Sequence, residues 1–441
     1  MKRLYPLFLA MTCTLPMQAQ SNSFTLKQCI EYGHTNHPSI KVGEYDIAFA
    51  RNRVKEGVAQ YLPQISGSFS LDNNLKLQAS VIPAGIFGPD PVEVRFGTKY
   101  MSNAALQAEQ KIFDYSLIAG YQGNKPSVRL SETQLDKTRE DIAYDIASAY
   151  EQVLVSKEQI KLLKVSRDNF KRIMDVGQLQ FEKGVMKKTD LDRIRVNYNN
   201  IVSQMYVAES AYDVSLNALK VSMGMSASEN ITIADSVSFD YAGASDVQST
   251  FDLNNRLDYR MLEQSIFLQN VQLKRYKAAY APVISAYGRY GALAQRNEFG
   301  ELWKNFSDFS SVGLRVQIPI FDGLYKDAKV KQQKFTMLKE KANLELYKLQ
   351  FELQYRNARF QLERNRTALV TDRENLQLAQ EVFNQTTLLY EKGAASLTDL
   401  LNAETSYNQS RTNYLNSVVN LKLAELDFER SKGTLLIFLS K

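Results

Sequence analysis

The chain has 441 residues, 44% of them hydrophobic, and a formal net charge of +6 with only two histidines and two cysteines. This length allows two or three ordinary domains or one elongated domain, and the nearly balanced charge without a basic cluster argues against nucleic-acid binding. No apolar run of about 18 residues follows the N-terminal segment, so the sequence predicts no transmembrane helix.

Residues 1–19 have the pattern of a secretory signal peptide. Two basic residues precede an apolar run that is too short to span a membrane, and residues 17–19 form an acceptable cleavage site. The residues before Cys13 match a lipoprotein processing site poorly, so acylation is not predicted. Cleavage after residue 19 leaves Cys29 as the one cysteine, which excludes an intrachain disulfide.

The remainder of the chain contains two copies of one plan. The segment "YLPQIS" at 61–66 corresponds to "YAPVIS" at 280–285, and "IFD" at 112–114 corresponds to "IFD" at 320–322. The spacing between these landmarks is 11 residues longer in the first copy. Such long-range similarity indicates an internal repeat.

The extra residues of the first copy fall in the segment Val81 to Glu93, which is rich in proline and glycine and is predicted to be a loop. We therefore predict a first structural repeat over 20–220, an inter-repeat equatorial segment over 221–251 and a second repeat over 252–441.

Each repeat begins with a predicted helix, over 40–59 and 259–278, which a proline terminates. Apolar and polar residues then alternate with a period of two. This alternation predicts two long strands per repeat, covering 65–81 and 95–112 in the first copy and ending with 312–320 in the second. Such strands fit a sheet packed on helices or a transmembrane β-barrel, for which four strands are too few and a trimer would supply twelve.

Long helices with a seven-residue period follow the strands, predicted over 133–182 and 324–391. Apolar residues recur seven apart before and after one turn of the second copy: Tyr355, Leu362, Leu369, Leu376, Phe383 and Tyr390, then Leu400, Tyr407, Tyr414, Leu421, Phe428 and Leu435. A sustained seven-residue period predicts a coiled coil with a left-handed supercoil.

The two turns between these helices are themselves repeated. "FEKGVMKKTDLD" at 181–192 aligns without a gap with "YEKGAASLTDLL" at 390–401. Gly184 and Gly393 are the expected helix breakers, and either Thr189 or Ser396 is a candidate cap for the helix that follows. Each copy is therefore predicted to be the turn of a long helical hairpin.

These features predict a mainly α-helical α+β chain. A fibrous coiled coil that tethers layers of the cell envelope would explain the helices but would leave the four strands without a purpose. A barrel with long helical extensions explains both.

The whole set of features resembles the TolC family of outer-membrane efflux proteins, also called outer membrane factors. The resemblance rests on the tandem halves, the order helix, two strands and two long helices in each, "YLP" and "YAP", "IFDG" at 320–323 and the two "EKG…TDL" turns. No single motif is specific, but the ordered and repeated set is. It covers essentially the whole mature chain.

The resemblance implies a homotrimer in the cell outer membrane, in contact with lipid. Its four strands per chain would form a trimeric 12-stranded transmembrane β-barrel, and its long coiled-coil helical hairpins would form an α-barrel that extends into the periplasm. The resemblance also implies partnership with a periplasmic adaptor (membrane fusion) protein and an inner-membrane pump. The implied function is the exit duct of a tripartite efflux or type I secretion system, which conducts substrates passively. The alternative is the structural tether described above.

The resemblance also implies a gate at the hairpin tips. Thr189 and Asp190 should face Tyr390, and Asp399 should line the pore as one carboxylate of a ring. Asn402 stands where relatives can carry a second acidic ring, and Ala395 where they carry a basic residue. Without the resemblance, Asp190 and Asp399 are solvated or helix-capping carboxylates. The tips implied to dock the adaptor are Gly184, Val185, Met186, Lys187, Gly393, Ala394, Ala395 and Ser396.

No other motif predicts chemistry. The pair His34 and His37 in "HTNH" lacks further ligands and makes a poor metal site. The sequence contains no G-x-S-x-G element and no phosphate-binding G-x-x-x-x-G-K-[ST] loop. We therefore expect no enzymatic activity, no catalytic residue, no metal and no cofactor, and any energy must come from a partner.

Overall fold

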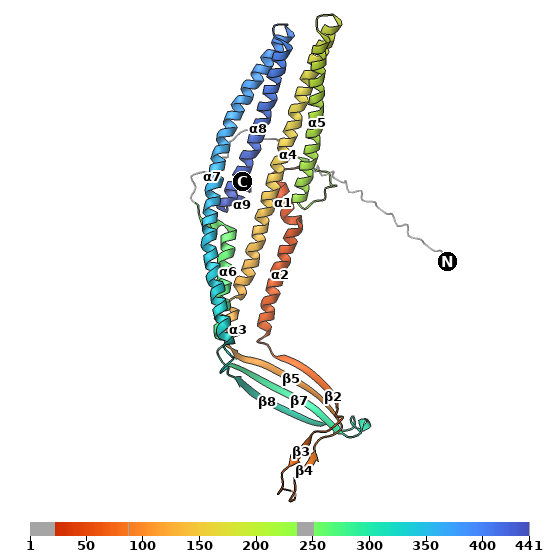
Figure 1. Cartoon of the computed structure of the whole chain (residues 1–441), viewed down its shortest axis with the longest axis vertical. Helices are drawn as coiled ribbons and strands as arrows, with labels where there is room; N and C mark the ends of the chain where they lie inside the picture. Colours follow the sequence, from red (N-terminus) through yellow and green to blue (C-terminus); the bar gives the residue numbers. More distant parts are fainter. Residues whose placement is uncertain (1–22, 87, 236–250, 441) are drawn as a thin grey trace, which may run out of the picture. The chain divides into compact units, whose positions relative to one another are not determined.

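The computed structural model describes residues 23–86, 88–235 and 251–440 (Figure 1). The predicted signal peptide lies outside these residues, as do residues 236–250 of the inter-repeat segment. The chain forms two compact units. The first, here called the tip unit, comprises Met1–Pro38, Arg139–Thr250 and Arg356–Lys441, and the second, here called the sheet unit, comprises Ser39–Thr138 and Phe251–Tyr355. Both sequence repeats contribute to each unit.

Four strands of the sheet unit form one antiparallel sheet in the order β2-β5-β7-β8. Each repeat supplies one adjacent pair: β2 (Gln64–Asn73) and β5 (Tyr100–Asp114), then β7 (Val283–Arg296) and β8 (Ser307–Gln317). The helices α2 (Pro38–Ala59) and α6 (Leu257–Ala278) precede β2 and β7, and the short helix α3 (Tyr115–Tyr121) follows β5. The predicted fold class, mainly helical with two strands per repeat, is confirmed.

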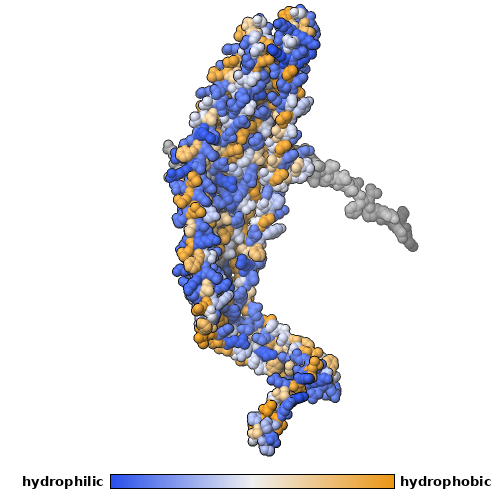
Figure 2. All heavy atoms as spheres, in the orientation of Figure 1, coloured by the Kyte–Doolittle hydropathy of each residue, from blue (hydrophilic) through white to orange (hydrophobic). Residues whose placement is uncertain are grey.

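The register of the sheet gives it one apolar and one polar face. On one face Phe69 pairs with Ala104, and Ala104 pairs with Ala292. The same face carries exposed apolar side chains along each edge of the sheet: Ile65, Phe69 and Leu71 on β2, and Val312, Leu314 and Val316 on β8. On the opposite face Arg315 lies 3.9 Å from Glu109. Figure 2 shows apolar side chains at the surface of the sheet among polar ones.

The first strand is shorter than the alternation predicts. It ends at Asn73, and the next residue leaves the ladder: Asn74 donates from its side-chain amide to the Thr98 carbonyl and from its backbone amide to the Lys99 carbonyl. The segment predicted as a loop contains a small hairpin, β3 (Ala79–Ile82) paired with β4 (Val92–Arg95). Short β-branched runs at both ends of the segment pair across its proline-rich and glycine-rich centre, so the loop prediction was too broad.

The tip unit is built on two helical hairpins (Figure 1). The end of α4 (Asn124–Glu182) and α5 (Lys188–Ser222) form one, and the end of α7 (Tyr325–Glu391) and α8 (Leu397–Lys432) form the other. Both long helices agree with the prediction. Smaller elements complete the unit: β1 (Ser23–Phe24), α1 (Leu26–Asn36), β6 (Thr232–Ile233) and α9 (Leu435–Leu439).

The seven-residue apolar period coincides with burial. Leu362, Leu400 and Phe428 have no exposed side-chain surface, and Leu421 has 1%. A left-handed coiled-coil seam requires this coincidence, because it keeps one stripe of each helix turned toward its neighbours. No helix among the described residues combines the length and the apolar character needed to cross a membrane.

Asp235 joins the inter-repeat segment to the N-terminus of the tip unit. Its Oδ2 accepts a 2.5 Å hydrogen bond from the Tyr150 hydroxyl and a 3.3 Å bond from the Leu26 amide, the first of α1. The neighbouring strands β1 and β6 pair in parallel. Burial and the Asp235 carboxylate both raise the pKa of Tyr150. The carboxylate therefore supplements the Thr25 cap of α1 by accepting from its first amide, and it holds a buried phenol at the same time.

We predict that Asp235→Ala loosens α1, because the change leaves the Leu26 amide and the Tyr150 hydroxyl without this acceptor. The expected loss is about 2 kcal/mol in the local opening free energy. Hydrogen-exchange mass spectrometry of peptides from α1 measures it. The exchange rate of Asp235→Asn, which keeps an acceptor oxygen, should lie between those of the parent and Asp235→Ala. Unchanged exchange in Asp235→Ala would contradict this role for the carboxylate.

Candidate functional site

The two hairpin turns share one backbone geometry. Gly184 and Gly393 adopt φ values of 75° and 73°, which confirms the prediction that they break the helices. The amide of Val185 donates to the Gln180 carbonyl at 2.9 Å, and that of Ala394 donates to the Leu389 carbonyl at 2.8 Å. A glycine in the left-handed region with this long backward bond is the usual end of a helix that must reverse.

The helices that follow the turns begin differently. Ser396 caps α8: its Oγ accepts from the Asp399 amide at 3.2 Å, and Asp399 Oδ2 accepts from the Ser396 amide at 3.1 Å. This reciprocal pair is a capping box. In the first hairpin the N-cap is Lys187, without a side-chain bond, and Thr189 lies inside α5. Capping by Ser396 is confirmed, whereas capping by Thr189 was wrong.

The cap determines the state of the Asp399 carboxylate within the chain. The Ser396 hydroxyl and then the Ser396 amide lower the pKa of Asp399, because both donate to its ionised form. The carboxylate therefore contributes to stability above its unfolded pKa, and this contribution is lost as the pH falls through the lowered value. Asp399 is solvent-exposed.

Four helices meet in one apolar cluster just behind the turns, here called the tip cluster. Every one of these helices contributes buried side chains: Phe170 and Ile173 from α4, Ile194 and Ile201 from α5, Phe383 and Tyr390 from α7, and Leu397, Leu400 and Ala403 from α8. The ring of Phe383 also stacks on Tyr407, with centroids 5.5 Å apart. The two hairpins of one chain therefore share a core at their tips.

Tyr390 is packed in this cluster with 9% of its surface exposed, and its buried hydroxyl has no hydrogen-bond partner among the described residues. Burial, and next the nearby Asp190 carboxylate, raise the pKa of Tyr390. Asp190 itself lies 3.9 Å from Arg193, and Thr189 is exposed. The structure thus brings Tyr390 close to Asp190 but does not form the hydrogen bond that the resemblance implies.

The remaining tip residues lie at the surface to different degrees. Val185 is 78% exposed, although it is apolar, and Met186 and Ala395 are half-buried because they pack against the tip cluster. The other predicted tip positions and Asn402 are exposed: Gly184, Lys187, Gly393, Ala394 and Ser396. Among them, Val185 is an apolar side chain presented to solvent at a turn.

A polar groove of about 670 Å³ lies between α4, α5 and α8 in the tip unit. Amides and hydroxyls line most of it, and it contains two charged side chains that sequence reasoning missed, Glu404 and Arg411. They are 7% and 3% exposed. Arg411 donates to Ser166 Oγ at 2.8 Å and to the Leu162 carbonyl at 3.3 Å, and Asn408 donates to Glu404.

The two charges stabilise each other through space. Burial raises the pKa of Glu404, while Asn408 and Arg411 oppose that rise. Burial lowers the pKa of Arg411, and the nearby Tyr407 and Glu404 side chains oppose this decrease. A sequence signal exists, because Leu397, Glu404, Arg411 and Val418 are seven residues apart and all buried. Charges at the buried positions of a heptad mark a polar contact inside the seam.

The histidine pair belongs to the N-terminal part of the tip unit. The His34 Nε2 lies 3.0 Å from the Arg139 carbonyl. The described part of the chain contains no group of three or more histidine, cysteine or acidic side chains that could hold a metal ion.

The sequence matches the family described as "Outer membrane efflux protein" over residues 34–225 and 252–434. The chain belongs to this outer membrane efflux protein family. The two matched segments correspond to the two halves that carry the hairpins, and members of the family are channel proteins rather than enzymes.

Relatives with this architecture have diverged widely in sequence. The alkaline protease secretion protein AprF of Pseudomonas aeruginosa is 21% identical over 296 residues, which cover 65% of this chain and 59% of AprF. This chain thus matches less than two thirds of AprF. The outer membrane protein TolC of Escherichia coli K12 is 17% identical over 447 residues, which cover 99% of this chain and 87% of TolC.

Solved structures agree with the fold at similar distances. The Campylobacter jejuni outer membrane channel CmeC superposes with a TM-score of 0.76 at 17% identity and covers 93% of this chain and 86% of its own. The CusC channel gives 0.75 at 16% identity and covers 92% and 91%. These superpositions establish a shared fold.

We predict that Tyr390→Phe leaves the unfolding free energy unchanged or raises it by up to about 1 kcal/mol, because it removes a buried hydroxyl without a partner. Denaturant unfolding followed by far-UV circular dichroism measures this change in the unfolding free energy. Tyr150→Phe is the matched control and should destabilise, since its hydroxyl binds Asp235. A clear loss of stability in Tyr390→Phe would show that the hydroxyl has a partner in the assembled protein.

We predict that Arg411→Met destabilises the tip unit by about 3 kcal/mol, because it leaves Glu404 buried without its nearby positive charge. The double variant Glu404→Gln/Arg411→Met should recover much of this loss. Denaturant titrations of the single and double variants measure the coupling. Arg193→Met, at an arginine with a 61% exposed side chain, is the control and should cost little. Additive losses in the double variant would contradict the coupling.

Proposed function

We propose that the chain is the outer-membrane exit duct of a tripartite efflux or type I secretion system. The observation that carries the proposal is the family match over both halves of a chain whose four-stranded sheet presents an exposed apolar face. A sheet with one apolar and one polar face suits a wall between lipid and an aqueous lumen.

The open edges of the sheet support assembly from several copies. Within the described chain, β2 pairs only with β5 and β8 pairs only with β7. Unpaired strand edges in a hydrocarbon layer are costly, so the edges must pair with other copies. Three copies supply twelve strands and close the ring, with the helical hairpins reaching into the periplasm.

Transport through such a duct is passive, and the energy comes from partners. We assign the inner-membrane pump the choice of substrate and the periplasmic adaptor the contact with the exposed turns. Val185 supports this assignment, because an apolar side chain at a solvent-exposed turn becomes favourable once a partner covers it. The neighbouring Met186 and Ala395 would anchor the contact to the tip cluster.

We further propose that the hairpin tips form the gate. Tyr390 is the latch residue, since its hydroxyl is buried without a partner near Asp190 and can donate a new hydrogen bond with little rearrangement. In a trimer, Asp399 forms a ring of three carboxylates that favours cations. Its cap with Ser396 fixes the carboxylate at the start of α8. Thr189 and Asn402 complete the proposed gate surface.

The experiment is single-channel recording of the purified protein in planar lipid bilayers. We expect a low resting conductance with cation preference. Asp399→Asn should weaken that preference, because it removes three charges from the ring but keeps an acceptor for the cap. The expected decrease in the cation-to-anion permeability ratio is about threefold or more, as removal of a pore charge shifts the local potential.

Glu391→Gln is the matched control, since it removes the same charge from an exposed site at the end of α7. It should leave the permeability ratio nearly unchanged. Equal effects of the two substitutions would remove Asp399 from the pore. A tether of envelope layers, the competing function, predicts no conductance under any condition, and that result would overturn the duct.

A further inference from the structure

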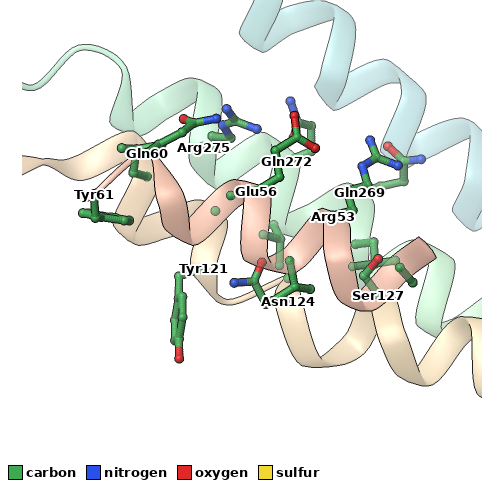
Figure 3. Close-up of a pocket in the computed structure, with 18 residues that line it drawn as sticks. Arg53, Glu56, Gln60, Tyr61, Tyr121, Asn124, Ser127, Gln269, Gln272 and Arg275 are labelled. Atoms are coloured by element: carbon green, nitrogen blue, oxygen red, sulfur yellow. The ribbon is translucent and has the colours of Figure 1, made fainter. Parts of the chain in front are cut away.

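The sheet unit contains a groove of about 550 Å³ that the duct function does not use. It lies between the end of α2, the junction of α3 and α4, and the end of α6 (Figure 3). Tyr61, at one end of the groove, precedes β2 by only three residues, and Leu117 of α3 follows the end of β5. The groove therefore borders the sheet.

Glycines leave this space open. A Cβ at Gly57 would meet nothing within 4 Å, and one at Gly120 would approach only the Arg275 side chain. Gly123 lies in the break between α3 and α4, where a Cβ would come within 3.3 Å of Val271. Small residues on two elements thus create the hollow, and apolar side chains such as Val54 and Leu268 form part of its lining.

The polar side of the groove has two rows. Arg53 and Glu56 lie on α2 and Gln60 directly follows its end, while Gln269, Gln272 and Arg275 follow one another along α6 (Figure 3). In this view Arg275 lies beside Gln60 and Arg53 lies beside Gln269. The two guanidinium groups therefore come from different helices and mark the two ends of the groove.

Neither guanidinium is used by the fold. The described structure gives the side chains of Arg53 and Arg275 no ion pair or hydrogen bond, and the same holds for Glu56, one turn from Arg53. Elsewhere in the sheet unit arginines have partners, as Arg51 has Glu132 and Arg256 has Asp258. Two arginines and one carboxylate leave the groove with a net positive charge, which favours an anion.

The chemistry selects a phosphate ester. A guanidinium donates two parallel hydrogen bonds to phosphate oxygens, and two guanidiniums separated along a groove suit an extended headgroup better than a small ion. Glu56 accepts from a hydroxyl and disfavours a second negative charge in the middle of the groove. Gln60, Gln272 and Asn124 add neutral donors.

The position of the groove selects a lipid as the source of the phosphate. The apolar sheet face begins directly beside it, with Ile65 and Phe69 exposed. Tyr121 and Leu62, also at this border, are 62% and 56% exposed. Tyrosine is enriched where an apolar layer meets water. This step rests on the proposed function, which puts the sheet in the membrane and the groove at its periplasmic surface.

We propose that the groove between α2 and α6 binds the headgroup of an anionic phospholipid, with Arg275 and Arg53 holding phosphate and Glu56 accepting from a glycerol hydroxyl. The acyl chains then lie along the apolar face of the sheet. The site would fix the depth at which the protein sits in the membrane.

Native mass spectrometry of the purified full-length protein tests the proposal, with titration by phosphatidylglycerol and, separately, by phosphatidylcholine. We expect preferential retention of phosphatidylglycerol. Arg53→Gln/Arg275→Gln should weaken that binding roughly tenfold, the equivalent of one lost charge-assisted contact pair. Lys334→Gln/Lys339→Gln removes two exposed positive charges from α7 and should leave it unchanged.

A second variant tests the electrostatic argument in the opposite direction. Glu56→Gln keeps an acceptor but raises the net charge of the groove, so it should bind phosphatidylglycerol as tightly as the parent or more tightly. Weaker binding in Glu56→Gln, or parent-like binding in the double arginine variant, would overturn the proposal.

Glycerol 3-phosphate separates the two sources of the phosphate. Binding as tight as that of phosphatidylglycerol would identify a soluble anion site and overturn the lipid assignment. These measurements are independent of conductance. A protein that conducts but shows no arginine-dependent lipid binding refutes this site alone, whereas a protein that never conducts refutes the duct.

Discussion

The tip unit depends on one apolar cluster, the tip cluster, to which both hairpins contribute buried side chains. Phe170 and Ile194 of the first hairpin pack in the same cluster as Phe383 and Leu400 of the second. Burial of such side chains contributes about 2 kcal/mol each, so separating the hairpins would cost more than any hydrogen bond at the turns. The tip cluster therefore holds the two turns in register, and the polar contacts at the turns are free to change without unfolding the helices. A gate built on these turns can be weak and still be well positioned.

Much of this arrangement is readable from the sequence because it depends on local periodicity. Heptads and helix-breaking glycines act over a few residues, and the long helices, both turns and the strand alternation were predicted on those grounds. The prediction that Thr189 caps α5 was wrong for an equally local reason. In the ungapped alignment Ser396 corresponds to Lys187, while Thr189 corresponds to Thr398, so the hydroxyl is two residues beyond the N-cap. The β3–β4 hairpin was not predicted, because the many glycines and prolines at the centre of the segment indicated a loop and its two strands are only four residues long.

The partners of buried charges could not be predicted in the same way. Arg411 donates to Ser166 of α4, which lies 245 residues earlier in the sequence. No local pattern identifies that partner. The heptad spacing of Glu404 and Arg411 signals only that charges enter the seam. The unmade bond of Tyr390 is a similar case, since the resemblance supplies the pair but not the rotamer or the distance. In both cases the identity of the contact depends on tertiary packing, and only the position on the helix is local.

Divergence between the repeats explains how the groove in the sheet unit became charged. With the spacing that relates "YLP" to "YAP", Arg53 corresponds to Gln272 and Glu56 corresponds to Arg275. Two identical helices side by side would present like charges to each other, which is unfavourable at short range. Here the two copies carry different residue types at each of these positions. The groove therefore contains two unpaired guanidinium groups and one carboxylate. These exposed charges make no ion pair or hydrogen bond within the described chain, so they leave the groove available to the anionic headgroup proposed above.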